Sequence, residues 1–293
     1  MAMKIEIVKP YGYCMGVSNA IDLAIKTRQK YQNRPVYVLG MLVHNDEALA
    51  KLANLGIKTL FEPRKSLVEL TNQLTKDSVV ILTAHGHAHE VEEALNERGI
   101  TFIDATCPFV KKSHQDMIDA INEDRDILYL GKNGHPEAIA ALSISSHIHL
   151  IEVNNPIIPN IECKNPLIIS QTTFSRRDIK PIIDDIFKKY PNAEIKKIGI
   201  CYASDQRQEA LLSLDKDVDL IYVVGGKLSN NTKTLYRLAL SNYPSAKVLM
   251  IENKDDINEK DLLGLNHIAI SSGASTPMDV IEEIKAKLES INN

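Results

Sequence analysis

The chain has 293 residues, of which 44% are hydrophobic and 25% are charged, and its formal net charge is −4. This composition excludes an intrinsically disordered chain, and the scattered basic residues give no electrostatic footprint for nucleic acid. No apolar run reaches the roughly 18 residues that a membrane-spanning helix needs, and the first residues are typical of a strand and not of a signal peptide. We therefore expect a cytoplasmic protein whose partner is a small molecule.

Short apolar runs rich in β-branched residues alternate with amphipathic helical stretches along the chain. In chain order, the predicted strands include residues 4–8, 36–40, 79–83, 127–131, 167–170 and 220–226. This alternation is typical of parallel sheets covered by helices. The expected fold class is therefore α/β.

Three cysteines each follow a strand-like run at nearly equal intervals. Cys14, Cys107 and Cys201 are 93 and 94 residues apart (107 − 14 and 201 − 107). After each cysteine come a helical pattern and a second strand that ends in glycine, at Gly40, Gly131 and Gly225. A fixed period predicts repeated structural units. We expect three α/β domains, covering residues 14–107, 108–201, and 202–293 together with 1–13.

Polar loops follow the glycines and also follow the third strand of each repeat. The third-strand loops are 83–89, 170–175 and 271–276. Open α/β sheets bind ligands beyond the carboxyl ends of their strands, where these loops and the three cysteines are expected. Three such ends around a pseudo-threefold axis would form one site.

Four cysteines are too few for a disulfide scaffold in a chain of this length, so we expect free thiols. Three thiolates in phase, without a fourth, predict a metal centre with an open coordination position. Zinc and an iron–sulfur cluster both suit such ligands, and spacing does not separate them. Cys163 lies outside the repeat and is interpreted as a buried small hydrophobic residue.

The strand-end loops also carry hydrogen-bond donors that suit a phosphate group. The candidates are His44, His85, His135, Ser229, Asn231 and Ser275. Helix N-termini and loop amides would add favourable dipoles. Glu137, next to this anion pocket, is the candidate general acid, although a charge at a helix N-terminus is an alternative interpretation. The remaining loop histidines, His87, His89, His147, His149 and His267, are interpreted as structural.

Several motifs taken together resemble a known enzyme family. They are GYCMGVSNAI, VHN, AHG, DATCPFVKKSH, GHPEAIA, SQTTFS, ICYASDQRQ and SSGAST, in order from about residue 10 to 280. The combination is similar to that of the 4-hydroxy-3-methylbut-2-enyl diphosphate reductases, the last enzymes of the methylerythritol phosphate route to isoprenoids.

The resemblance implies a trefoil of three α/β domains, each with a small, mostly parallel sheet flanked by helices, around a central cluster. It implies one [4Fe-4S] cluster on Cys14, Cys107 and Cys201 with an open apical iron. It also implies that Glu137 delivers protons and that Thr172 orients both Glu137 and the substrate hydroxyl. The implied diphosphate ligands are His44, His85, His135, Ser229, Asn230, Asn231 and Ser275.

The implied reaction is a two-electron reductive dehydroxylation that yields isopentenyl and dimethylallyl diphosphate. No dinucleotide-binding fingerprint is present, so the electrons would come from a ferredoxin or a flavodoxin. Two alternatives remain open: an iron–sulfur hydro-lyase, which needs no reductant, and a redox sensor, which turns over no substrate.

The chain departs from the family pattern at four positions. Asn230 stands where the family usually has serine, Ser204 where it usually has threonine, Leu228 where asparagine is frequent, and Met15 where the residue is usually small. Asparagine still donates a hydrogen bond, so diphosphate binding at position 230 remains an expectation.

Overall fold

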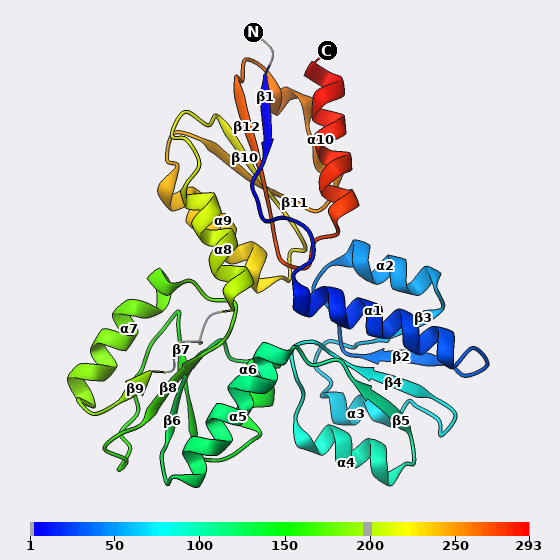
Figure 1. The fold of residues 1–293 in the computed structure, drawn as a ribbon, viewed down its shortest axis with the longest axis vertical. Coiled ribbons are helices and arrows are strands. Elements are labelled where there is room, and N and C mark those ends of the chain that lie inside the picture. Colours follow the sequence, from blue (N-terminus) through cyan, green and yellow to red (C-terminus); the bar gives the residue numbers. More distant parts are fainter. Residues whose placement is uncertain (1–2, 196–200, 293) are drawn as a thin grey trace. The chain divides into compact units, whose positions relative to one another are not determined.

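The computed structural model describes residues 3–195 and 201–292, and this part of the chain contains three four-stranded parallel sheets (Figure 1). In spatial order, the first sheet contains β1 (Lys4–Ile7), β12 (His267–Ser272), β10 (Leu220–Val224) and β11 (Lys247–Ile251). The second contains β5 (Thr101–Asp104), β4 (Val79–Leu82), β2 (Val36–Leu39) and β3 (Ile57–Leu60). The third contains β9 (Glu194–Ile195), β8 (Leu167–Ser170), β6 (Ile127–Gly131) and β7 (Ile148–Glu152). All three sheets therefore have the same strand order.

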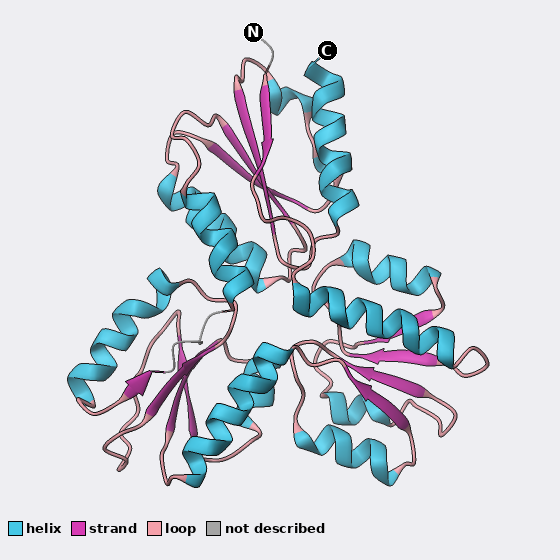
Figure 2. Cartoon of the chain, viewed as in Figure 1, coloured by secondary structure: helices cyan, strands magenta, loops and turns pink. Residues whose placement is uncertain are grey.

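Helices cover both faces of each sheet (Figure 2). The first sheet packs against α8 (Tyr202–Leu212) and α9 (Asn230–Asn242) on one face and against α10 (Met278–Asn292) on the other. The second packs against α1 (Met15–Lys30) and α2 (Asp46–Asn54), and against α3 (Leu67–Thr71) and α4 (His89–Glu97). The third packs against α5 (Pro108–Asn122) and α6 (Pro136–Leu142), and against α7 (Arg176–Lys189). Two 3₁₀ turns, η1 (Lys254–Asp256) and η2 (Glu259–Leu262), lie between β11 and β12.

Buried central strands explain the continuous apolar runs of the sequence. In β10, Ile221 and Val223 pack towards α8 and α9, whereas Tyr222 and Val224 pack towards α10. Alternate residues of a strand face opposite sides of the sheet, so a strand covered on both faces is apolar throughout. The predicted α/β class and parallel sheets are confirmed.

The six predicted strands named above all form, with ends within two residues of the prediction. The cysteines differ in their distance from a strand. Cys107 is three residues beyond the end of β5, but Cys14 is seven residues beyond the end of β1. Pro10, which has no backbone N–H, lies in that longer connection. The strand predicted immediately before Cys201 falls on 196–200, outside the described residues.

The chain groups into two compact units. One comprises Met1–Val17, Val43–Ala50 and Tyr202–Asn293, and the other comprises Ser18–Leu42 and Lys51–Cys201. The first unit contains the β1 sheet, and the second contains the other two. The division into three domains and their pseudo-threefold arrangement stay predictions. No helix in the described part of the chain is both long and apolar enough to cross a bilayer.

Candidate active site

The three cysteines of the repeat have equivalent backbone anchors. Each donates its amide hydrogen to the loop that follows the neighbouring strand of its sheet. The N···O distances are 2.9 Å from Cys14 to Ala274, 3.0 Å from Cys107 to Ala84 and 3.1 Å from Cys201 to Thr172. The spacing of 93 and 94 residues between the cysteines therefore corresponds to one position that is repeated in the three sheets.

Each cysteine also directly precedes a helix, namely α1, α5 or α8. The Cys14 sulfur lies 3.4 Å from the amide nitrogen of Val17 in the first turn of α1, and this amide donates to it. All three cysteines are free thiols of intermediate exposure. Amides and the positive end of a helix favour a thiolate, the form that binds metals. These residues therefore fit the thiolate ligands of an iron–sulfur cluster.

Within residues 3–195 and 201–292, no three His, Cys, Asp or Glu side chains are placed to hold one metal ion.

Glu137 is a buried carboxyl group held by Thr172. The Thr172 amide donates to Oε1 at 2.8 Å, and the Thr172 hydroxyl donates to Oε2 at 2.9 Å. The Glu137 side chain belongs to the first turn of α6, and the residue is only 4% exposed. Burial raises its pKa to about 7, although the two hydrogen bonds from Thr172 act in the opposite direction. Glu137 can therefore hold a proton near neutral pH.

Two imidazoles lie close to each other at the start of α6. The Nδ1 atom of His135 accepts a hydrogen bond from the Glu137 amide at 3.2 Å, so a neutral His135 carries its proton on Nε2. The ring of His85 is 5.8 Å from that of His135, at an interplanar angle of 87°. Glu137, Thr172, His85 and His135 thus form one polar group, at the carboxyl ends of β4, β6 and β8.

Asn231, in the other unit, connects several elements near Cys14. Its Oδ1 accepts a hydrogen bond from the Ala274 amide at 2.9 Å, and its Nδ2 donates to the Ser204 hydroxyl at 3.0 Å. The carbonyl of the same Ala274 accepts the Cys14 amide. The Asn231 side chain therefore supports the backbone at Cys14, a role that the sequence did not suggest.

The remaining polar residues of this unit gather around the start of α9. Ser229 is the N-cap, and its hydroxyl oxygen accepts a hydrogen bond from the Thr232 amide at 3.3 Å. Asn230, the first residue of the helix, is buried. The Ser275 hydroxyl lies 3.5 Å from the His44 carbonyl oxygen, to which it donates. All of them belong to the first unit, to which His44 is contributed by the segment Val43–Ala50 that follows β2.

Arg207 is a buried residue to which the sequence gave no role. One guanidinium nitrogen donates to the Gly12 carbonyl at 2.7 Å, and another donates to the Ala203 carbonyl at 3.0 Å. Gly12 precedes Cys14 by two residues, so Arg207 fixes the long connection between β1 and that cysteine. The available signal for this role was the presence of Arg207 in the ICYASDQRQ motif. Because an arginine is rarely buried unless it is paired, its burial implies the hydrogen bonds that the structure shows.

Two of the four departures from the family pattern carry exposed side chains, with Met15 at 56% and Leu228 at 60%. Ser204 is buried, and its hydroxyl meets Asn231 as described above.

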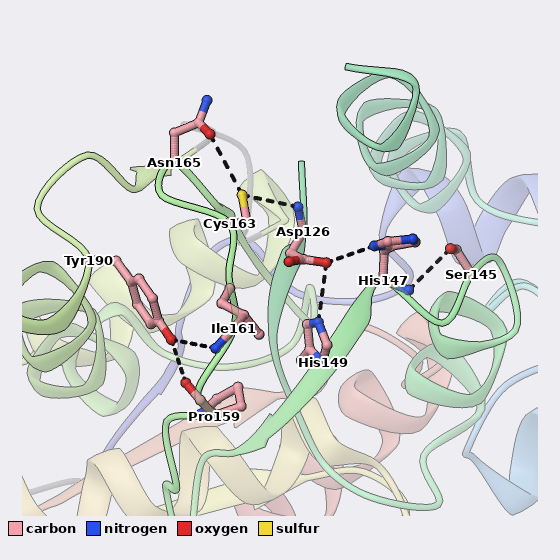
Figure 3. A network of polar contacts seen from close by, with 9 residues as sticks. All are labelled: Asp126, Ser145, His147, His149, Pro159, Ile161, Cys163, Asn165 and Tyr190. Atoms are coloured by element: carbon pink, nitrogen blue, oxygen red, sulfur yellow. Dashed lines mark hydrogen bonds and ion pairs between the residues drawn. The ribbon is translucent and has the colours of Figure 1, made fainter. Parts of the chain in front are cut away.

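Cys163 has intermediate exposure, so the prediction that it is buried was wrong, and it lies in a separate polar network (Figure 3). Its sulfur is 3.5 Å from the donating amide nitrogen of Asp126 and 3.6 Å from the side-chain oxygen of Asn165. The Asp126 carboxylate contacts the rings of His147, at 2.9 Å, and His149, at 3.3 Å. Asp126 and His147 directly precede β6 and β7, so the network is at the amino ends of the strands, opposite the loops that carry Glu137 and Thr172.

Comparison with known proteins places the whole chain in one group. The family model described as LytB protein matches residues 5–289. The 4-hydroxy-3-methylbut-2-enyl diphosphate reductase of Brevibacillus brevis is 35% identical over 98% of this chain and 92% of its own length. The protein of the same name from Bacillus cytotoxicus is 38% identical over 98% of this chain and 90% of its own length.

Solved structures agree with this result. The E-1-hydroxy-2-methyl-but-2-enyl-4-diphosphate reductase of Plasmodium falciparum matches with a TM-score of 0.86 and 28% identity, over 98% of this chain and 88% of that one. A second structure, of the (E)-4-hydroxy-3-methyl-but-2-enyl diphosphate reductase described as the terminal enzyme of the non-mevalonate pathway, matches with a TM-score of 0.67 and 28% identity over 98% and 99% of the two chains. The α/β fold is thus shared over nearly the full length.

Proposed function

The chain belongs to the LytB protein family, and on that premise we propose that it reduces 4-hydroxy-3-methylbut-2-enyl diphosphate to isopentenyl and dimethylallyl diphosphate. The observation that carries this proposal is that the chain matches reductases over 98% of its own length and over 92% and 90% of theirs. The buried carboxyl group of Glu137, which can hold a proton near neutral pH, supports it independently. The full-length relatives are reductases, which favours this activity over a hydro-lyase or a sensor.

Cys14, Cys107 and Cys201 are the proposed ligands of one [4Fe-4S] cluster. Their support is the equivalent backbone anchoring, the free thiols and the helix that follows each one. When bound, a cluster with one iron free of protein ligands supplies single electrons and a Lewis-acidic position.

Glu137 is the proposed proton donor. In the balanced reaction, the allylic C–O bond breaks, two electrons and two protons enter, and the oxygen leaves as water. A protonated Glu137 can supply the proton that turns the departing hydroxyl into water. Thr172 holds both carboxyl oxygens, which fixes the direction in which that proton is delivered.

The proposed diphosphate ligands are His44, Ser229, Asn230, Asn231 and Ser275 in one unit, and His85 and His135 in the other. The N-terminus of α9 adds backbone amides to this set. Since one amide hydrogen of Asn231 already goes to Ser204, only its second hydrogen is left for an anion. Asn231 thus has two tasks, binding phosphate and supporting Cys14.

The electron donor is proposed to be a ferredoxin or a flavodoxin, and the location the cytoplasm. The sequence lacks a dinucleotide-binding fingerprint, which supports an external electron donor. The cysteines are not in disulfides, and thiols persist in a reducing compartment, which supports the cytoplasm.

The test is anaerobic purification, analysis of iron and sulfide, and turnover of the substrate with a reduced one-electron donor. We expect close to four irons per chain and turnover only when the reductant is present. Glu137→Gln should keep the iron and lose most of the turnover, whereas Cys163→Ser should keep both. A full cluster with no turnover under reducing conditions would refute the assigned activity, and stoichiometric zinc without iron would refute the cluster.

A further inference from the structure

A cavity of about 350 Å³ lies within the second unit, beside the proposed active-site residues but separate from them. The loop after β4, the start of α4, and α5 and α6 all contribute to its wall. Its ionisable lining residues are His87, His89, Glu92, Asp104, Lys111 and His114. Asp104 and Lys111 pair with each other at 2.6 Å, and the exposed His89 lies 3.5 Å from Glu93, which leaves His87, His114 and Glu92.

His87 has the arrangement of a metal ligand. Its side chain is only 8% exposed, and its Nε2 lies 2.8 Å from a carboxylate oxygen of Glu92. A carboxylate accepts hydrogen bonds, so Nε2 carries the proton and Nδ1 has a lone pair. That Nδ1 is buried and has no hydrogen-bond partner among the described residues. Histidines that bind metals characteristically give their other ring N–H to a carboxylate in this way.

His114 lines the same cavity as His87 and provides a second nitrogen. Its Nε2 is also buried without a hydrogen-bond partner in the described part of the chain. A β-carbon built on Gly86, which directly precedes His87, would be 3.1 Å from Cε1 of His114, the carbon bonded to Nε2. Burial lowers the pKa of His114, which favours the neutral imidazole that binds metals.

We propose that His87 and His114 bind a divalent transition-metal ion of intermediate softness, such as Zn²⁺, with Glu92 fixing the ring of His87 and water completing the coordination. Imidazole nitrogens suit zinc, nickel and copper. Two protein ligands, compared with three or four in catalytic and structural zinc sites, make this a weak and reversible site. Within 3–195 and 201–292, no group of three donors is placed to hold a metal ion.

The proposed metal site lies between two elements that carry proposed active-site residues. His87 follows His85 by two residues on the same loop, and His114 is on the helix that begins after Cys107. A bound ion would therefore join a proposed diphosphate-binding loop to the helix of a proposed cluster ligand. It would stabilise the native chain by mass action, because the two histidines line one cavity only when the chain is folded.

The experiment is equilibrium dialysis of the anaerobic holoenzyme against micromolar Zn²⁺, with zinc and iron measured in the same sample. We expect close to one zinc per chain, no loss of iron, and a rise in melting temperature. His87→Ala and His114→Gln should each abolish the added zinc. Glu92→Gln, which leaves both ligands in place, should weaken zinc binding about tenfold.

The matched control is His147→Ala, because His147 is an exposed histidine of the same unit whose ring contacts Asp126 instead of the cavity. It should take up zinc like the unsubstituted protein. Equal uptake by all these proteins would overturn the proposal, and so would uptake that is accompanied by loss of iron, which would place the zinc on cysteines. If the histidine variants lose iron and therefore report on folding, unchanged zinc affinity in Glu92→Gln would overturn it by itself.

Discussion

Glu137 shows how its surroundings give a carboxyl group its function. A glutamate in the first turn of an exposed helix would be a solvated charge that favours the helix dipole. Here the carboxyl group is buried, and desolvation outweighs both hydrogen bonds from Thr172, so that its pKa rises to about 7. The structure places Glu137 in the first turn of α6, the position that the alternative interpretation as a helix N-terminal charge expected, and only 4% of the residue is exposed.

The pH dependence of the reaction should report this residue. If Glu137 donates a proton, kcat/KM should fall about tenfold per pH unit above a pH of about 7, where the free enzyme loses that proton. In the Glu137→Gln variant, kcat/KM should be low and should not fall in this way above a pH of about 7. The substrate ionises in the same way for both proteins, so the variant is the control. If kcat/KM of the variant still falls above a pH of about 7, another group is responsible for that fall.

The free energy of unfolding should also depend on pH, and the shift in the pKa of Glu137 determines the direction of this change. The pKa of Glu137 rises from 4.5 to about 7 on folding, so the folded chain holds the proton more tightly. This contribution is complete below pH 4.5 and is lost as the pH rises through about 7. Glu137→Gln cannot titrate, so relative to the unsubstituted protein it should gain up to roughly 3 kcal/mol between pH 5 and 8. Thermal melts at both pH values measure this, and parallel curves would contradict it.

At the scale of elements, the carboxyl-end loops are held together by close backbone contacts. A β-carbon on Gly226 would be 2.4 Å from the His44 carbonyl oxygen, so the loop after β10 and the loop with His44 touch through their backbones. Glycine permits this approach because it has no side chain. The sequence indicated polar clusters after each strand, but it gave no reason for this glycine.

Gly226→Ala should therefore displace the His44 loop and weaken diphosphate binding. We expect a rise of tenfold or more in KM, with iron content unchanged, because the clash is with backbone and cannot be relieved by a side chain. Gly264→Ala is the matched control: Gly264 has a φ of +75° and nothing within 4 Å of the added carbon. It should lose about 1 to 2 kcal/mol of stability through backbone strain and keep its KM. Equal KM values in the two variants would remove the proposed role of the Gly226 contact.

At the scale of the whole chain, periodicity was the most informative feature of the sequence. The intervals between cysteines predicted the repeat, and the common strand order with matched cysteine anchors confirms it. Buried strands were equally clear because burial on both faces requires continuous apolar runs. The pairings of Asn231 with Ser204, Arg207 with Gly12, and His87 with Glu92 were not predictable. Those contacts depend on how loops and helix starts pack, for which spacing along the chain provides no rule.

The three equivalent cysteines lead to a prediction about stability as well as chemistry. A cluster that binds only the folded chain adds its binding free energy to the free energy of unfolding. Cys14→Ser, Cys107→Ser and Cys201→Ser should therefore each lower iron content and melting temperature to a similar extent. Cys163→Ser, whose sulfur contacts Asp126 and Asn165, should change neither. Removing iron from the unsubstituted protein with a chelator should bring its melting temperature down to that of the three variants. A chelated protein that melts like the untreated one would show that the cysteines contribute to the fold without a cluster.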